Sequence, residues 1–324
     1  MTILGWHASH EQIPPSQLLM AAQLAEQVGF DAVMSSDHFS PWSHRQGESG
    51  FAWSWLGAAL QATALPFGVV TAPGQRYHPA IIAQAIATLL EMFPGRLWVA
   101  LGSGEASNEH ITGSGWPRKP VREHRLRECV DVMRALLAGE EVSHNGLITV
   151  DRARLWTRPE HPPPLIGAAV SVETARWVGE WADGLVTIKQ PREHLERMID
   201  AFRGNGGDDK PLYLQVHVSW ADAEDEALAI AHDQWRSNVF PPPVSWDLEL
   251  PAHFDEASAY VRPEDMRGAV EVSADLGYHA AWLSEMVDLG FDGIWIHHVG
   301  KSQRAFLEAF GDKVLPQVRG SRDD

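Results

Sequence analysis

The sequence is poor in positive charge. Its 324 residues include 26 Lys and Arg against 43 Asp and Glu, which gives a formal net charge of −17 at pH 7. A protein that binds nucleic acid needs a basic face to neutralise phosphates, and a protein attracted to anionic lipid needs one too. We therefore expect no nucleic acid and no membrane among its partners, and a small molecule as its substrate.

Cysteine and long apolar runs are also scarce. Cys129 is the single cysteine, so an intrachain disulfide is excluded and a cysteine metal site is not expected. No apolar run approaches the roughly 20 residues of a membrane span. The N-terminus lacks the basic and apolar regions of a signal peptide. With a hydrophobic fraction of 44%, the composition predicts a folded cytoplasmic protein.

Tyrosine is rare whereas tryptophan is abundant, with 4 Tyr against 14 Trp. Most tryptophans pack in protein cores, and we expect the same of most of these. Trp42 differs because it lies in a polar loop shortly after a predicted strand. An aromatic side chain in that place can lie against a flat conjugated cofactor, so Trp42 is a candidate site residue.

The chain alternates short apolar runs with longer amphipathic stretches. This pattern is typical of βα units around a parallel sheet. Eight such units in this length predict a closed (β/α)8 TIM barrel, an α/β fold of about 250 residues, with insertions. An open doubly wound sheet is the alternative, but no Gly-x-Gly-x-x-Gly follows the first strand. The predicted strands are Ile3–Ala8, Asp31–Ser36, Pro66–Thr71, Leu97–Leu101, Pro164–Ala168, Gly184–Thr187, Leu212–Val218 and Gly293–His297.

Three segments depart from this alternation. Glu141–Val150 is predicted to be a hairpin that turns at Asn145-Gly146. Residues 240–261 form an insertion without clear periodicity, and Pro263–Asp275 is predicted to be helical. We expect one barrel domain over residues 1–320, including that insertion, and a tail at 321–324.

Polar residues after the strands mark the candidate site, because barrels bind ligands at the C-terminal ends of their strands. His38 follows the second strand, and its imidazole is suited to carry protons near neutral pH. Asp37 beside it can orient the ring or bind a ligand. Glu105 follows the fourth strand among small residues that would let a planar ligand approach the backbone. A helix cap or a solvated side chain remains the alternative interpretation for each.

A weaker pattern concerns anions. Lys189 and Arg304 lie near late strand ends, where barrels often hold phosphate, and are candidates for binding an anionic substrate group. The segment before the helix at residue 172 could present backbone amides to a phosphate.

Two other function classes remain open. The 16 histidines suggest a metal-dependent barrel hydrolase, although the first strand lacks a His-x-His pair and we expect no metal. A non-catalytic barrel that binds a ligand is the other.

Three runs, taken in order, carry a family resemblance: SSDHFSPW at 35–42, RYHPAIIAQA at 76–85 and GSGEASNE at 102–109. They resemble the bacterial luciferase-like superfamily of TIM-barrel flavin enzymes. The chain resembles most the branch that contains the F420-dependent glucose-6-phosphate dehydrogenases, and it looks closer still to a sibling group of these enzymes that is presumed to use FMN. The likeness extends over nearly the whole chain.

The resemblance implies roles for individual residues. His38 would accept an alcohol proton while hydride leaves for the cofactor ring, and Glu105 would act as the acid on the opposite side. Trp42 would lie near the transition state, Glu11 near His38, and Asp37 on the cofactor. The other residues that would contact the cofactor are Val69, Val70, Ser103, Gly104, Asn108, Ala168, Ala169 and Ser171.

The resemblance further implies a flavin-type oxidoreductase and a homodimer. We expect FMN as cofactor, with coenzyme F420 as the alternative, and either dehydrogenation or monooxygenation as the reaction. Glucose 6-phosphate is not the expected substrate, because the insertion at 240–261 contains no lysine where the sugar-phosphate enzymes use cations on late loops.

Overall fold

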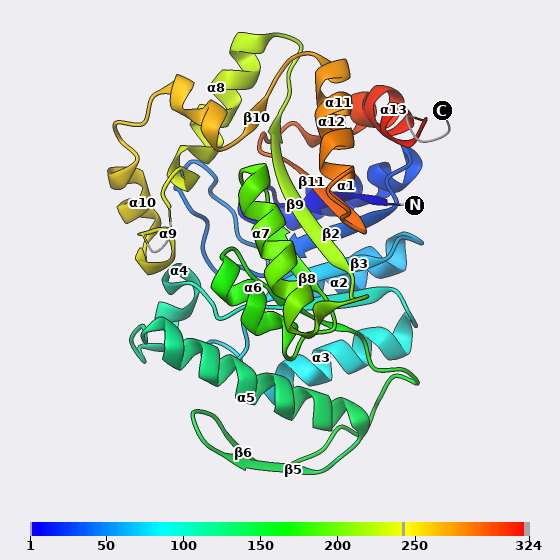
Figure 1. The fold of residues 1–324 in the computed structure, drawn as a ribbon, viewed down its shortest axis with the longest axis vertical. Coiled ribbons are helices and arrows are strands. Elements are labelled where there is room, and N and C mark those ends of the chain that lie inside the picture. The colour runs from blue at the N-terminus through cyan, green and yellow to red at the C-terminus, as the bar shows by residue number, and fades with distance from the viewer. Residues whose placement is uncertain (1, 242–243, 321–324) are drawn as a thin grey trace.

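The computed structural model describes residues 2–241 and 244–320, which form a closed parallel barrel wrapped by helices (Figure 1). Each strand pairs in parallel with the next, and β11 and β9 close the ring onto β1 and β8. The predicted (β/α)8 TIM barrel is confirmed, and each predicted strand lies within one residue of the observed one at either end. The barrel strands are β1 (Ile3–Ala8), β2 (Ala32–Ser36), β3 (Phe67–Thr71), β4 (Leu97–Leu101), β7 (Leu165–Ala168), β8 (Leu185–Ile188), β9 (Leu212–Ser219) and β11 (Gly293–His298).

The helices cover the outer face of the barrel because each buries an apolar stripe against it. In α3, for example, Ile82, Ile86 and Leu90 are buried at helical spacing, and the His78 side chain accepts a hydrogen bond from the N–H of Ala80 at the helix start. None of the helices in the described part of the chain is long and apolar enough to span a membrane. The outer helices are α1 (Pro15–Gln27), α2 (Ala52–Ala62), α3 (Pro79–Met92), α5 (Lys119–Ala138), α6 (Val172–Gly179), α7 (Arg192–Phe202), α8 (Glu224–Trp235), α11 (Leu276–Val287), α12 (Gln303–Ala309) and α13 (Leu315–Gly320).

Three aromatic side chains fill the inside of the barrel. Trp98, Tyr213 and Trp295 lie with ring centroids 4.9–5.0 Å apart. Gly68 pairs directly with Trp98, and Gly5 with Trp295. A Cβ atom at either glycine would lie 2.1 or 2.6 Å from the indole beside it, so only glycine leaves room for these rings. Part of the tryptophan excess is therefore barrel packing, as expected for most of these residues.

The predicted hairpin is confirmed as the antiparallel strands β5 (Val142–Asn145) and β6 (Thr149–Ala153), which lie outside α5 (Figure 1). The insertion contains two short helices, α9 (Val244–Asp247) and α10 (Pro251–Ala257). Residues 242–243 of the insertion and the expected tail at 321–324 lie outside the described residues.

The helical prediction for Pro263–Asp275 was wrong in its second half. A 3-10 helix covers Pro263–Gly268, and the strand β10 (Glu271–Val272) follows it. Residues 271–272 form a strand instead of a helix because the C-terminal end of β9 has an edge that β8 leaves unpaired. Strand β8 pairs with β9 only as far as Gln215, and β10 pairs with its upper end at Val218 and Ser219.

Candidate active site

His38 lies between two carboxylates at the C-terminal ends of the strands. Its Nδ1 is 2.5 Å from Oε1 of Glu11, and its Nε2 is 3.8 Å from Oε2 of Glu105. These residues follow β2, β1 and β4, so three loops of the barrel bring them together. The Glu11 side chain is 4% exposed, whereas His38 and Glu105 are 19% and 23% exposed. The pair that faces the mouth of the barrel is therefore His38 and Glu105.

Glu11, His38 and Glu105 form a row of three titratable side chains, and their surroundings shift their pKa values in different directions. Burial alone would lower the pKa of His38, but the Glu11 carboxylate outweighs it and raises that pKa to about 9. Burial would raise the pKa of Glu11, and His38 lowers it to about 2. Burial raises the pKa of Glu105, against the pull of His38. At neutral pH His38 and Glu11 thus form an imidazolium–carboxylate pair, and Glu105 beside them has a raised pKa.

Neighbouring side chains fix the geometry of this row. The Ser9 hydroxyl donates to Oε2 of Glu11 at 2.8 Å. Asn108 accepts hydrogen bonds from the backbone N–H groups of Phe39 and Ser40 and donates from Nδ2 to Glu105 at 3.3 Å. Because it binds the chain just after His38 as well as Glu105, Asn108 sets the distance between the two. Asn108 thus links the loops after β2 and β4. Its expected contact with a cofactor stays a prediction.

Trp42 packs against the His38 ring. Its ring meets the His38 ring edge to face, with centroids 5.4 Å apart, and its backbone N–H donates to Gln46. The family resemblance implies that Trp42 lies near the transition state, which stays a prediction; the structure shows its ring beside the imidazole.

Asp37 is enclosed by the protein. Its carboxylate accepts hydrogen bonds from Trp53 Nε1, Thr71 Oγ1 and Tyr77 OH at 2.9–3.1 Å, and Nη2 of Arg76 lies 3.6 Å away. The side chain has no exposed surface. Asp37 therefore ties the loops after β2 and β3 together and, in this arrangement, presents no oxygen to a ligand.

A second buried ion pair joins the loops after β3 and β4. The Arg76 backbone N–H donates to Oε2 of Glu109 at 2.7 Å, and its Nε lies 3.6 Å from Oε1. Burial raises the pKa of Glu109. Gly104, at φ 84°, leaves room for the Glu109 side chain. Sequence reasoning gave Arg76 and Glu109 no role, although both lie in the runs that carry the resemblance.

Three histidines line the barrel below the mouth. The rings of His7 and His297 stack with centroids 4.6 Å apart, and His217 lies 5.4 Å from His297. Burial lowers the pKa of His7 to about 4 and that of His217 to about 3, so these imidazoles are neutral at pH 7. Sequence reasoning did not single out His217. The signal is its spacing of two residues from Gln215 and four from Tyr213, which puts all three side chains on the inner face of β9.

Small residues stand at the rim of the barrel where β4 and β7 end. A Cβ atom added at Gly102 would lie 3.8 Å from the Cβ of Ala168, an ordinary contact distance, so the chain carries no bulky side chain at these two positions; we call this pair of strand ends the ledge. Val70 and Ala168 point into the barrel and are partly exposed.

The other predicted cofactor residues lie around this rim in different settings. Ser103 and Gly104 are partly exposed in the loop after β4. Val69 is fully buried in the main core cluster, and Ala169 is buried beyond β7. The Ser171 hydroxyl caps α6 by accepting from the N–H of Thr174.

The two candidate anion-binding cations have carboxylate partners within the chain. Lys189 Nζ is 3.6 Å from Glu271, which also accepts a hydrogen bond from the Tyr278 hydroxyl. Arg304 pairs with Glu308 on the exposed side of α12. The two cations therefore bind different carboxylates and do not form one shared site. Within residues 2–241 and 244–320, no group of three His, Cys, Asp or Glu side chains could hold a metal ion, so a metal-dependent hydrolase has no ligand set there.

Comparisons with known proteins identify the family and the fold. The family model for luciferase-like monooxygenases matches residues 2–292. An F420-dependent glucose-6-phosphate dehydrogenase of Microbacterium testaceum is 34% identical, over 97% of both chains. An F420-dependent secondary alcohol dehydrogenase, solved with an F420–acetone adduct, is 30% identical, with a TM-score of 0.90 over 98% of this chain and 99% of that one. The F420-dependent tetrahydromethanopterin reductase of Methanopyrus kandleri shares the fold, with a TM-score of 0.76 at 20% identity and coverage of 98% and 99%.

Proposed function

The chain belongs to the luciferase-like monooxygenase family, and from this premise we propose that it is an F420-dependent dehydrogenase that interconverts an alcohol and its carbonyl compound. The observation that carries the proposal is His38 held between Glu11 and Glu105 at the strand ends. A base paired with a carboxylate, and an acid with a raised pKa close by, are the groups that a hydride transfer needs to manage its protons.

F420 is the coenzyme that we propose, in place of FMN, which the sequence had favoured. The support comes from the relatives at 30% identity or more, whose names specify F420. The ledge between Gly102 and Ala168, with Val70 and Gly104 beside it, would hold the ring system. When bound, the coenzyme would accept the hydride that the alcohol carbon loses.

The residues of this chain would handle the protons. His38, once neutral, would take the hydroxyl proton of the substrate on Nε2, which faces the mouth. Glu11 would hold the ring by Nδ1 and stabilise the imidazolium that results. Glu105 would keep its own proton available on the other side, and Asn108 would fix its distance from His38.

We propose an uncharged alcohol as the substrate. Lys189 and Arg304 already have carboxylate partners, so neither is free to bind a substrate phosphate in this arrangement. The neutral imidazoles of His7 and His217 suit hydroxyl or carbonyl groups rather than an anion. The solved alcohol dehydrogenase of similar sequence agrees with this choice.

Absorbance titrations with F420 and with FMN test the coenzyme, and F420 reduction by a series of secondary alcohols or by glucose 6-phosphate tests the substrate. We expect F420 to bind and to be reduced by at least one uncharged alcohol, and glucose 6-phosphate to be a poor substrate. Binding of FMN with oxygen consumption would favour the monooxygenase instead. If neither ring bound, the proposal would fail.

The pH dependence provides a further prediction. Because His38 must be neutral to act as a base, we expect kcat/KM for alcohol oxidation to rise with pH through a midpoint near 9, the raised pKa of His38. In Glu11→Gln the carboxylate that raises this pKa is lost and burial, which lowers it, remains. The midpoint should then fall by about 1–3 pH units. Rate profiles of wild type, Glu11→Gln and the surface control Glu308→Gln check this, and an unmoved midpoint in Glu11→Gln would contradict it.

A further inference from the structure

One carboxylate of the insertion binds three consecutive residues of the loop that carries the candidate base. Asp255, in α10, accepts hydrogen bonds from the Ser43 hydroxyl at 2.6 Å and from the His44 backbone N–H at 3.1 Å. His44 Nδ1 and Arg45 Nη1 lie 2.8 and 2.9 Å from its oxygens. Burial would raise the pKa of Asp255, but the Ser43 and His44 donors hold it below its usual value. The carboxylate is therefore ionised at neutral pH.

The residue before Asp255 makes an apolar contact with the same loop. Phe254 is fully buried, and its ring meets the Trp42 ring edge to face at 5.4 Å. Trp42 meets His38 in the same way at the same distance. Three aromatic rings thus run without interruption from the insertion to the imidazole.

The other end of the insertion reaches the Glu105 side of the mouth. Asp247, in α9, accepts a hydrogen bond from Trp116 Nε1 at 2.8 Å. Helix α9 also contacts α4 (Ala106–Glu109), and the two helices lie side by side in Figure 1. Helix α4 begins directly after Glu105. The insertion therefore bridges the loops that carry His38 and Glu105.

The loop has other fixed points on either side of residues 43–45: Asn108 accepts hydrogen bonds from the N–H groups of Phe39 and Ser40, and the Trp42 N–H donates to Gln46. Lys301 donates to the carbonyl oxygens of Arg45 and Gln46, and Gln46 donates to the carbonyl of Gln234. The side chains of Ser43 and His44, next to Trp42, have Asp255 as their partner.

We propose that Asp255 is a positioning residue for His38: it fastens the insertion to residues 43–45, so that Phe254 holds the Trp42 ring against the imidazole. Nothing in the sequence of the insertion marks this role, and it rests on the proposed function of His38 as the base.

Asp255→Asn tests this inference with the shape of the side chain preserved. The amide keeps one acceptor oxygen and loses the charge, so residues 42–45 should loosen. We expect kcat to fall about 10- to 100-fold with the F420 dissociation constant and the thermal midpoint little changed, and hydrogen exchange of residues 40–46 to accelerate. Glu256→Gln, one residue further along the same helix and exposed, is the matched control and should change none of these.

A second variant, Phe254→Leu, keeps an apolar side chain at this buried position and removes the ring contact, and it should lower kcat in the same way. An unchanged kcat in Asp255→Asn would overturn the inference. So would a joint loss of F420 binding and thermal stability, which would make the role of Asp255 structural. Hydrogen exchange is measured without ligand. If wild-type protein fails to reduce F420, the proposed function fails, whereas unchanged exchange at residues 40–46 would refute the fastening by Asp255 separately.

Discussion

His38→Ala lowers kcat for alcohol oxidation about 10²–10⁴-fold, the usual contribution of a general base, while the F420 dissociation constant changes less than about threefold. We expect this split because Nε2 of His38 faces Glu105 and the mouth, whereas Gly102 and Ala168, which we propose to hold the ring, belong to the ends of β4 and β7. Steady-state rates and absorbance titrations of the same preparations measure both quantities.

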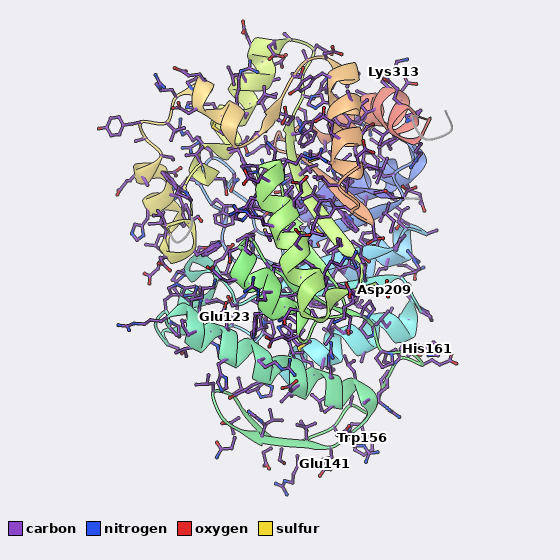
Figure 2. The ribbon with its side chains drawn as sticks, in the orientation of Figure 1. Glu123, Glu141, Trp156, His161, Asp209 and Lys313 are labelled. Carbon is purple, nitrogen blue, oxygen red and sulfur yellow. The ribbon has the colours of Figure 1, made fainter. Side chains whose placement is uncertain are left out.

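The matched control for this variant is an exposed histidine. His161 lies at the surface, away from the barrel mouth (Figure 2), with its side chain 89% exposed. His161→Ala should keep full activity. Loss of F420 binding in His38→Ala, in place of turnover, would give His38 a structural role and remove the base from the proposed mechanism.

Asp37→Ala lowers the free energy of unfolding by about 3–5 kcal/mol, the typical cost of removing one partner of a buried charge pair. The substitution leaves the buried donors of Trp53, Thr71 and Tyr77 without an acceptor, and Arg76 without one of its two carboxylates. Urea unfolding measures the loss. Asp151→Ala, at an exposed position in the hairpin, should cost little.

The same variant separates two roles for Asp37. Because the Asp37 side chain is enclosed, we expect a loss of stability as the primary effect of the substitution. F420 binding should weaken only if the loops after β2 and β3 move. A variant of normal stability that no longer binds F420 would instead support the direct cofactor contact that the family resemblance implies for Asp37.

The barrel strands were predictable because their signal is local. A short apolar run between turn residues predicts a buried strand wherever it lies, and the eight runs agree with the structure to within a residue. Strand β10 carries no such signal. It consists of Glu271 and Val272, and it exists because β8 leaves the upper edge of β9 free, which is a property of the sheet rather than of those two residues.

The candidate site divides in the same way. The positions of Glu11, His38 and Glu105 follow from strand ends that meet at one rim. The enclosure of Asp37 does not, because its donors Trp53 and Thr71 belong to separate elements and their directions depend on packing. The hydrogen bonds of Asp255 with residues 43–45 join two segments that are about 210 positions apart in the chain. One of the segments is the insertion, which has no periodicity, and no sequence pattern in either segment predicts the contact.

The aromatic rings inside the barrel limit the routes that ligands can take. Trp98, Tyr213 and Trp295 fill its interior among the described strands, and Gly5 and Gly68 bring the neighbouring strands close to the indoles. A barrel packed in this way is closed at its lower end. Under the proposed function, coenzyme and substrate would share a single entrance, and the molecule that lies deeper would have to arrive first and depart last.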